Sequence, residues 1–407
     1  MLKYAISPVR DLQIDNLYIA LLNYIVAKQT NDDFILFIQD LEVQNNSTQA
    51  GDIIEILKKF AIDAKHTIYQ SQNLKTYQLF AKRALQDDKA YVCFCNEDSC
   101  KNSCIDLSKQ EVQSKIDSNN SYSIYIKEPR NTIFINDKIK GKTLLNPSDI
   151  GSFKIIDQNL NPTQTFANAI DNMSSNITTI IRDEKEIIET FKELYIQNML
   201  GYNQDIEYIH LPSILDKKSD LSSIIWLFKE GFLPDAIIDY LISLNYDLKK
   251  DIHYLPDIIN NLVVTKVTKN KKYNFNELKE FNKKHLELID SIKLSSIVGF
   301  ADESIGELLK YFLKDATTIN ELEKKFSSIF SKKECDESLK ELSKLIFKAP
   351  MINSYDELIE YLLINCSLDK KTLEVKLQKL ISKDDTIDTK EVYPFIKTYI
   401  MEVAKCQ

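Results

Sequence analysis

The stretch from Ser7 to Leu17 decides the fold of this 407-residue chain; it reads Ser7-Pro8-Val9-Arg10-Asp11-Leu12-Gln13-Ile14-Asp15-Asn16-Leu17. It follows a short apolar segment, residues 2–6, that reads as a strand, and it leads into residues 15–29, whose apolar spacing predicts a helix. A strand, a turn with proline and a helix N-terminus form the layout of a nucleotide site in an open α/β sheet. The stretch contains no glycine and no histidine. It therefore keeps the layout of a phosphate site without the small residue that lets phosphate approach the backbone.

Alternating strands and helices follow this stretch. Phe34–Ile38 is a continuous apolar run of strand length, as expected of a parallel strand buried on both faces. Helices are predicted at residues 52–61 and 74–85, and strands at 66–69 and 91–94. This order predicts a Rossmann-type α/β domain with right-handed crossovers.

The pattern changes in residues 95–164, where strand-like pieces at 121–126, 132–135 and 152–157 alternate with polar turns. We interpret this part as a smaller α+β insertion. From about residue 275 to the end, nearly every segment has the spacing of an amphipathic helix. The C-terminal half is therefore expected to be all-α.

The composition limits the class of protein. The net charge is −8, from 52 Lys and Arg against 60 Asp and Glu. It argues against a protein that binds nucleic acid over its whole surface, although it is compatible with one basic face. No apolar run approaches the roughly 18 residues of a transmembrane helix. The first residues do not resemble a signal peptide. We therefore expect a cytoplasmic protein with no membrane partner.

The seven cysteines are odd in number and scattered, so a disulfide framework is not expected. Three of them have no suggestive partner in the sequence: Cys335, Cys366 and Cys406. The other four lie within twelve residues: Cys93, Cys95, Cys100 and Cys104. Four thiolates around a tetrahedral ion are a common structural zinc site; free thiols in a reducing compartment are the alternative.

Seven short segments occur in order along residues 1–245: Ser7–Leu17, Phe34–Glu42, Tyr91–Cys95, Pro162–Ala167, Ile180–Glu184, His210–Pro212 and Gly231–Leu241. They resemble the motifs S-P-T-G-x-L-H-I-G-N, F-L-L-R-I-E-D-T-D, A-Y-x-C-x-C, P-T-Y-x-F-A, V-I-R-G-E-D-H, H-L-P and G-Y-L-P-E-A…N-Y-L of bacterial glutamyl-tRNA synthetases, which are class I enzymes. Any one match is weak, whereas seven in order identify the chain as a divergent paralogue of this family.

The resemblance implies a domain plan. A Rossmann-type catalytic domain would occupy residues 1–90 and 166–230, interrupted by an acceptor-binding-like insertion at 91–165. A helical stem-contact-like domain at 231–292 and an all-helical anticodon-binding-like domain at 293–407 would follow. The family's partner is tRNA, and its cofactors are ATP with Mg²⁺. The amino-acid and ATP positions that the resemblance implies are Lys3, Ser7, Gln39, Gln164 and Arg182.

The departures from the family fall on positions that carry its chemistry. The histidine and glycine of the first motif correspond to Gln13 and Asp15. A carboxylate at position 15 would repel a nucleotide in a partly dry site. The loop that reads K-M-S-K-R in the family brings lysines to the phosphates; here only residues 216–221 remain, with Lys217 and Lys218.

The amino-acid positions differ as well. The family's arginine, acid and tyrosine correspond to Lys3, Gln39 and Gln164, whereas Arg182 is kept. Some members bind zinc through a C-x-C pair, which Cys93 and Cys95 match. Cys100 and Cys104 come earlier than the family's second ligand pair.

Three functions remain open. The first is a degenerate synthetase that binds tRNA, or another synthetase or amidotransferase component, with impaired or absent activation of glutamate by ATP. The second is an active glutamate–tRNA ligase that uses altered residues. The third is a non-catalytic interaction protein. We expect a monomer in each case.

Overall fold

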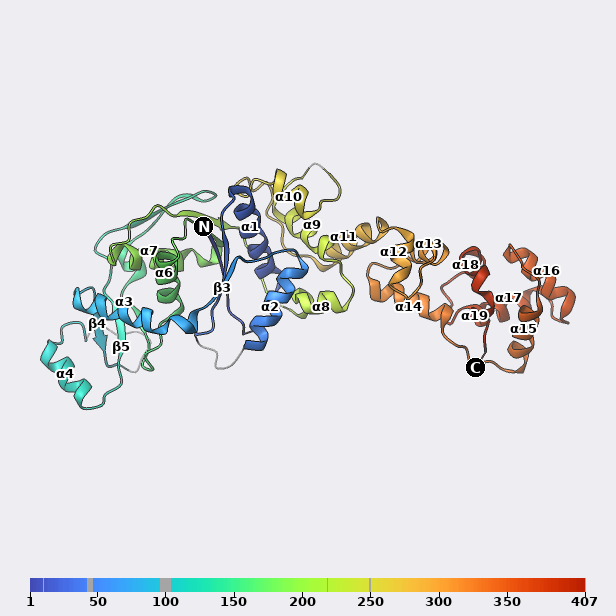
Figure 1. The fold of residues 1–407 in the computed structure, drawn as a ribbon, viewed down its shortest axis with the longest axis horizontal. Coiled ribbons are helices and arrows are strands. Elements are labelled where there is room, and N and C mark those ends of the chain that lie inside the picture. The colour runs from blue at the N-terminus through green and yellow to red at the C-terminus, as the bar shows by residue number, and fades with distance from the viewer. Residues whose placement is uncertain (10, 42–46, 96–103, 218, 249, 407) are drawn as a thin grey trace. The chain divides into compact units, whose positions relative to one another are not determined.

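The computed structural model describes residues 1–9, 11–41, 47–95, 104–217, 219–248 and 250–406. The chain folds into two compact units, the first formed by Met1–Trp226 with Ile238–Tyr273 and the second by Leu227–Ile237 with Asn274–Gln407. In Figure 1 the first unit is mainly blue to yellow and the second mainly orange to red. The finer domain boundaries that the resemblance implies stay a prediction.

The main sheet of the first unit has seven strands in the order β3-β2-β1-β9-β10-β6-β7. Neighbouring strands are parallel except β6 and β7, which form an antiparallel edge. Every residue of β2 is buried, as its continuous apolar run predicts. The strands are β1 Leu2–Ile6, β2 Phe34–Ile38, β3 His66–Tyr69, β6 Ile133–Asp137, β7 Gly141–Leu145, β9 Thr179–Asp183 and β10 Glu207–Leu211. The predicted Rossmann-type fold is confirmed.

Helices pack on this sheet and position its loops. α1 (Ile14–Thr30) begins directly after Gln13, whose backbone is extended, and ends at Asn31, whose φ of 54° is left-handed. The buried residues of α1 include Leu17 and Ile14, so apolar side chains of the opening stretch anchor this helix in the core. The other helices are α2 Ser47–Lys59, α3 Leu74–Gln86, α6 Gln164–Ser174, α7 Ile187–Met199, α8 Ile224–Lys229, α9 Pro234–Asn245 and α10 Leu255–Asn261, with short 3-10 turns at Gln70–Asn73, Glu184–Glu186 and Asp220–Ser222.

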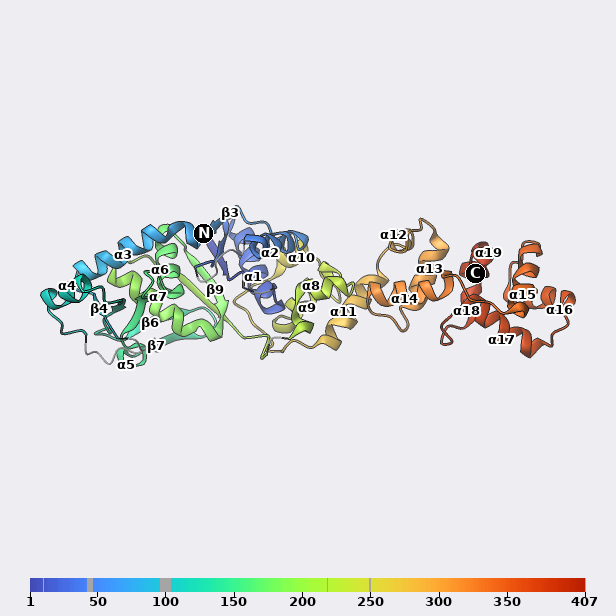
Figure 2. The same cartoon turned by 90° about the horizontal axis from the view of Figure 1, so that it is seen from below.

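A second, smaller sheet contains three antiparallel strands, β4 Ala90–Cys93, β5 Ser123–Ile126 and β8 Phe153–Ile156. α3 lies alongside β4 (Figures 1 and 2). Two helices belong to the same part of the chain, α4 Lys109–Asp117 and α5 Pro147–Ile150. The α+β composition expected here is present, and its β6 and β7 extend the main sheet instead of joining the small one.

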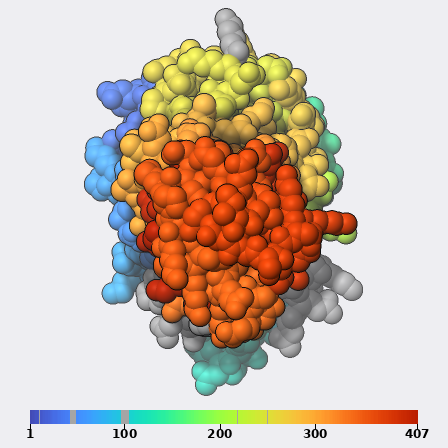
Figure 3. Space-filling view, turned by 90° about the vertical axis from the view of Figure 1, so that its right-hand side faces the viewer, coloured from blue at the N-terminus to red at the C-terminus, as the bar shows by residue number. Residues whose placement is uncertain are grey.

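The second unit is all-α, as predicted from the amphipathic spacing. Its helices begin at polar residues because a side-chain oxygen there accepts a backbone N–H that the first turn leaves unpaired. Eight such caps are present: Asn274, Asp290, Asp302, Thr318, Asp336, Ser354, Asp369 and Asp388. The helices are α11 Phe275–Glu287, α12 Ser291–Ser296, α13 Glu303–Phe312, α14 Ile319–Phe330, α15 Glu337–Lys348, α16 Tyr355–Asn365, α17 Lys370–Ile381, α18 Thr389–Ile396 and α19 Ile400–Val403, with a 3-10 turn at Lys397–Tyr399. The surface that faces the viewer in Figure 3 belongs largely to the red C-terminal helices of this unit.

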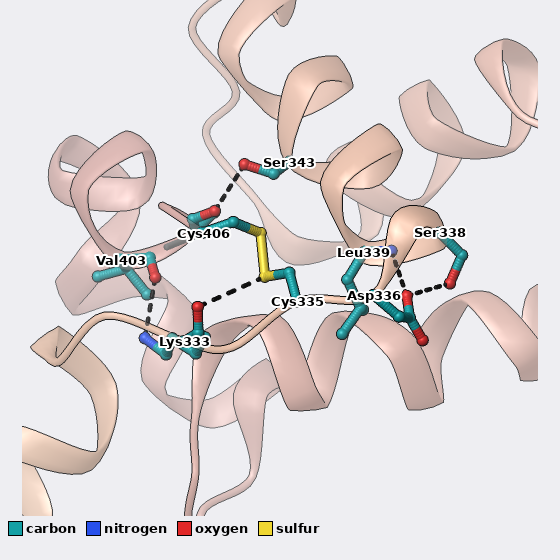
Figure 4. Close-up of a disulfide and its surroundings, with 9 residues drawn as sticks. Lys333, Cys335, Asp336, Ser338, Leu339, Ser343, Val403 and Cys406 are labelled. Carbon is teal, nitrogen blue, oxygen red and sulfur yellow. Dashed lines mark hydrogen bonds between the residues drawn. A yellow bond between two sulfur atoms is a disulfide. The ribbon is translucent and has the colours of Figure 1, made fainter.

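A disulfide joins Cys335 to Cys406, two cysteines for which the sequence suggested no partner (Figure 4). The two residues are 71 positions apart, and nothing local in the sequence reports such a pairing. Beside the disulfide, the buried ammonium of Lys333 donates to the carbonyl of Val403 at 2.8 Å and to that of Ile329. These contacts fasten the last turn of the chain to the segment between α14 and α15.

No helix in the described part of the chain is long and apolar enough to cross a membrane.

Two glycines provide a test of the packing in each unit. A Cβ at Gly306 in α13 would lie 1.9 Å from the carbonyl oxygen of Ser291, whereas a Cβ at Gly51 in α2 would meet nothing within 4 Å. We expect Gly306→Ala to lower the free energy of unfolding of the helical unit by about 1–3 kcal/mol, because backbone must move. Gly51→Ala should raise stability by about 0.5–1 kcal/mol, because alanine is the better helix former. Denaturant unfolding of both variants measures this, and a Gly306→Ala protein as stable as the parent would contradict the packing.

Candidate functional site

A cavity of about 650 Å³ lies at the carboxyl ends of β1 and β9. β1 pairs with β2 on one side and with β9 on the other. The chain therefore builds the sheet outward in opposite directions from β1, with β2 and β3 on one side and β9 and β10 on the other. In open α/β sheets ligands bind at such a switch point. The structure brings all five substrate-binding positions implied by the resemblance to the wall of this cavity: Lys3, Ser7, Gln39, Gln164 and Arg182. Their roles stay a prediction.

Arg182 on β9 is bound to the protein itself. Its guanidinium donates to both carboxylate oxygens of Glu193 on α7, at 3.0 and 3.2 Å, and to the hydroxyl of Thr190 at 3.2 Å. Both members of the pair are buried. Burial alone would lower the pKa of Arg182, but the neighbouring Glu193 and Glu186 outweigh burial and raise it. The bidentate face that would clamp a ligand carboxylate is therefore occupied.

The ammonium group of Lys3, on β1, also contacts other side chains of the protein. Its buried Nζ donates to the side-chain oxygens of Asn168 at 3.3 Å and Asn172 at 3.1 Å, and it lies 4.5 Å from the centre of the Phe37 ring. Burial lowers the pKa of Lys3, although the carboxylate of Asp171 acts in the opposite direction. Two of the three N–H groups of this ammonium therefore have amide acceptors within the protein, and the charge also lies against an aromatic ring.

Gln13 and Asp15, at the start of α1, form different hydrogen bonds. Gln13 is 9% exposed; its Oε1 accepts from the hydroxyl of Ser222 at 2.6 Å, and its Nε2 donates to the carbonyl of Asp11 at 3.3 Å. Asp15 lies in the first turn, where its Oδ1 accepts the backbone N–H of Asn16 at 2.9 Å. Gln13 thus lines the cavity and ties the loop after β1 to Ser222.

Of the two lysines in the shortened loop, the structure describes Lys217 only. Lys217 is exposed and is not among the described residues that line the cavity. Lys218 lies outside the described residues.

His210 on β10 has a structural position. It is completely buried, with Nδ1 2.7 Å from an oxygen of Asp137 and Nε2 2.9 Å from the hydroxyl of Thr190. Burial alone would raise the pKa of Asp137, but hydrogen bonds from His210 and from the backbone N–H groups of Lys140 and Ile139 outweigh it and lower the pKa. His210 therefore joins the polar interior of the sheet instead of facing a ligand.

Several residues that shape the site were not singled out from the sequence. Glu193 pairs with Arg182, and Asn168, Asp171 and Asn172 on α6 form the acceptor set beneath Lys3 and Gln70. A signal was present, because these three polar residues recur at helical spacing among apolar neighbours in α6. The sequence did not show which residue each of them would meet.

Three cysteines of the predicted cluster come together in the small sheet and the loop that follows it. The Sγ atoms of Cys93, Cys95 and Cys104 all lie within 4.8 Å of one another, and those of Cys95 and Cys104 are 3.7 Å apart. Cys100 lies outside the described residues. Three thiols at this separation suit a tetrahedral zinc ion, which prefers thiolate ligands.

Comparisons with known proteins agree on one family. Residues 1–288 match the family model described as tRNA synthetases class I (E and Q), catalytic domain. The chain is 36% identical over 427 residues to glutamate–tRNA ligase 2 of Sulfurovum sp. (strain NBC37-1), with 99% of this chain and 100% of that chain covered. It is 36% identical over 435 residues to glutamate–tRNA ligase 2 of Sulfurimonas denitrificans (strain ATCC 33889 / DSM 1251), with both chains covered completely.

A solved structure shares the fold. It is a glutamate tRNA ligase from Elizabethkingia meningosepticum in complex with its amino acid, with a TM-score of 0.77 and 20% sequence identity, covering 99% of this chain and 97% of that chain. At this identity the likeness shows the fold alone.

The ion pair of Arg182 and Glu193 can be tested with two matched substitutions. We expect Glu193→Gln to lower the free energy of unfolding by about 3 kcal/mol, because it removes the buried carboxylate of the pair and leaves the guanidinium with only the exposed Glu186 at 3.8 Å. Glu189→Gln is the control: its carboxylate is 41% exposed and pairs with Lys192, so the change should stay within about 1 kcal/mol. Denaturant unfolding at neutral pH measures both, and equal effects of the two changes would show that the buried pair is not important for stability.

Proposed function

Because the chain belongs to the glutamyl-tRNA synthetase family of class I enzymes, we propose that it retains the tRNA-binding framework of that family and has lost efficient activation of glutamate by ATP. The coarse function, a glutamate–tRNA ligase-like protein, follows from the family. The state of its activity is the part that we propose.

One observation carries the proposal: both cations of the cavity, Lys3 and Arg182, are bound by the protein's own side chains. A dicarboxylic amino acid needs positive partners for its carboxylates. Releasing Arg182 to a substrate would leave Glu193 as a buried, unpaired carboxylate, which is costly. The site therefore opposes the substrate that the family activates.

ATP and Mg²⁺ fit the cavity poorly. The charged residues on its wall are two cations and four carboxylates, and the described lining contains no glycine. Phosphate sites in sheets of this kind use close backbone approach at glycine. A chain without these groups, whose shortened loop keeps only Lys217 and Lys218, should activate glutamate slowly, because each lost donor to the phosphates is worth roughly 2–4 kcal/mol of transition-state stabilisation.

The partner that we propose is tRNA, as the family implies; a second synthetase or an amidotransferase component is the alternative partner. We place the protein in the cytoplasm as a monomer. An active ligase with altered residues remains the competing function, and a non-catalytic interaction protein without a tRNA role is the third.

Exchange between ATP and pyrophosphate in the presence of glutamate tests the proposal. We expect a rate about 10⁴-fold below that of the Sulfurovum ligase under the same conditions, because several stabilising groups are absent and their losses do not add independently. The double variant Gln13→His with Asp15→Gly should stay inactive, since Lys3 and Arg182 remain occupied. Exchange at the rate of that ligase would instead support an active glutamate–tRNA ligase.

Binding of tRNA is measured in parallel on the full chain. We expect an affinity that falls linearly on a logarithmic scale as salt is raised, because Lys and phosphate contacts release counterions. Absence of salt-sensitive binding would favour the interaction protein.

A structural zinc ion at Cys93, Cys95 and Cys104 is the second part of the proposal. The support is the convergence of three Sγ atoms and the thiolate preference of zinc. Its role would be to hold β4 and the segment that follows it; no chemistry at the cavity depends on it.

Metal analysis tests the zinc site. We expect about one zinc per chain, loss of zinc in Cys95→Ser, and a lower melting temperature in chelator, because a structural ion contributes to folding. Cys366→Ser is the matched control, because Cys366, like Cys95, is a partly buried cysteine that forms no disulfide, but it lies outside the cluster. A protein without zinc whose melting is unchanged by chelator would exclude the site.

A further inference from the structure

A cavity of about 380 Å³ in the helical unit lies beside the disulfide between Cys335 and Cys406. Cys406 lines this cavity, whereas Cys335 is not among the described residues of its wall. Both cysteines are partly exposed, so the disulfide is not sealed inside the hydrophobic core. A small molecule in the cavity therefore reaches the disulfide from the side of Cys406.

Positive charge surrounds this side of the disulfide. Among the described residues of the cavity wall are four lysines and no acidic residue; the lysines are Lys340, Lys344, Lys348 and Lys405. Three of them recur every four positions on α15, which places them on one face of the helix, and the fourth directly precedes Cys406. Within the part of the chain that the structure describes, none of the four forms an ion pair. The cavity therefore attracts an anion, although the chain as a whole has a net charge of −8.

The last turn of the chain closes over a buried cation. The ammonium of Lys333, which is 2% exposed, donates to the carbonyl of Val403 at 2.8 Å, and the hydroxyl of Ser343 donates to that of Ala404 at 2.8 Å (Figure 4). Burial lowers the pKa of Lys333 to about 8. Because an ammonium prefers water and both of its described acceptors are backbone carbonyls, closing the turn over Lys333 is unfavourable by itself. The disulfide offsets this by joining the turn to the segment before α15.

The chemistry of the compartment decides how long such a bond lasts. In a reducing cytoplasm, where we place the protein, disulfides are rare, and those that form are usually transient. A disulfide is broken by a thiolate, which attacks one sulfur atom and forms a mixed disulfide. Nearby lysines stabilise a thiolate and attract a thiol that carries additional negative charge. The lysine-lined cavity beside Cys406 therefore suits an anionic thiol as the attacking group.

We propose that the disulfide of Cys335 and Cys406 is a site of reversible exchange with a small thiol that carries a further negative charge, and that exchange releases the last turn of the chain. In the first step, the thiolate attacks the sulfur of Cys406. A new S–S bond joins the two, the bond to Cys335 breaks, and Cys335 leaves as a thiolate that takes a proton from water. In the second step, another molecule of the thiol displaces Cys406. Two thiol molecules are thereby oxidised to one small disulfide, and the protein disulfide is reduced to two thiols.

Three thiols of similar size test the inference on the full oxidised chain. 2-Mercaptoethanesulfonate, 2-mercaptoethanol and cysteamine differ in the group remote from the sulfur, which is negative, neutral and positive respectively. We expect the rate of reduction at Cys406, per thiolate and relative to an uncharged small disulfide, to fall in that order by about threefold to tenfold for each step at low ionic strength. The differences should shrink as salt is added. Quenched alkylation and peptide mapping measure the rate at this disulfide alone.

Two matched double variants test the lysines. Lys344→Gln with Lys348→Gln should slow reduction by the sulfonate thiol by about threefold to tenfold and leave the rate with 2-mercaptoethanol within about twofold. Lys371→Gln with Lys379→Gln is the control, because it also removes two exposed lysines from one helix of this unit, but neither of them lines the cavity. Circular dichroism verifies that each variant is folded. Equal rates for the three thiols, or equal effects of the two double variants, would overturn the inference.

Trapping the intermediate locates the point of attack. After a short exposure to the sulfonate thiol and an acid quench, we expect mass spectrometry to find the mixed disulfide on Cys406. A mixed disulfide found mainly on Cys335 would contradict the proposed attack. A purified protein in which the two cysteines do not pair under oxidising conditions would contradict the site itself.

Hydrogen exchange tests the release of the last turn. We expect the backbone amides of residues 400–405 to exchange at least about tenfold faster after reduction, while those of α17 keep their rate. The variant Cys335→Ser with Cys406→Ser should show the fast exchange without any thiol. Unchanged exchange at residues 400–405 after reduction would show that the disulfide does not hold the turn. Neither the site nor these tests involve the cavity at the carboxyl ends of β1 and β9, so the inference is independent of the proposed function.

Discussion

The buried ion pair between Arg182 and Glu193 is the contact on which the rest of the site depends. Removing two charges from water costs free energy that only their mutual attraction and hydrogen bonds can offset. The pair therefore holds β9 to α7, and replacing either residue alone is unfavourable. Hydrogen bonds extend from it through Asn172 to Lys3 and through Thr190 to His210. The polar interior at the switch point of the sheet is therefore satisfied by the protein itself, before any ligand arrives.

The hydrogen-bonded polar interior described above does not need a ligand, so the synthetase fold can persist while polar residues of the site differ from those of the family. The frame of the opening stretch is apolar: Leu12, Ile14 and Leu17 are all buried, so the turn and α1 keep their position without any ligand. Among the polar positions around that frame, Gln13 is held by hydrogen bonds to Asp11 and Ser222 and not by apolar packing. What replaces the family's cationic site is an arrangement of amides above two occupied cations, with carboxylates at the rim. The fold is retained by burial, and we propose that a few polar side chains change the recognition.

Secondary structure was largely predictable, because the signals are local. The run Phe34–Ile38 is a strand that is buried throughout, and the all-α half follows from helical spacing and from caps such as Asp336 and Asp369. The site was only partly predictable. The resemblance identified five positions that do line one cavity, but it could not show that Arg182 would be paired with Glu193. The pairing of Cys335 with Cys406 was missed for the same reason, since its partners are 71 residues apart.

The sequence by itself determined the alternation of strands and helices, the frame of the opening stretch and the family to which the motifs belong, because each of these depends on neighbouring residues. Only the tertiary structure decided which charges meet. Lys3, Asn168 and Arg182 come from β1, α6 and β9, and their distances follow from the order of strands in the sheet. Whether a cation is free for a ligand or already occupied depends on those distances and on burial, because Coulomb energies and desolvation change steeply with both.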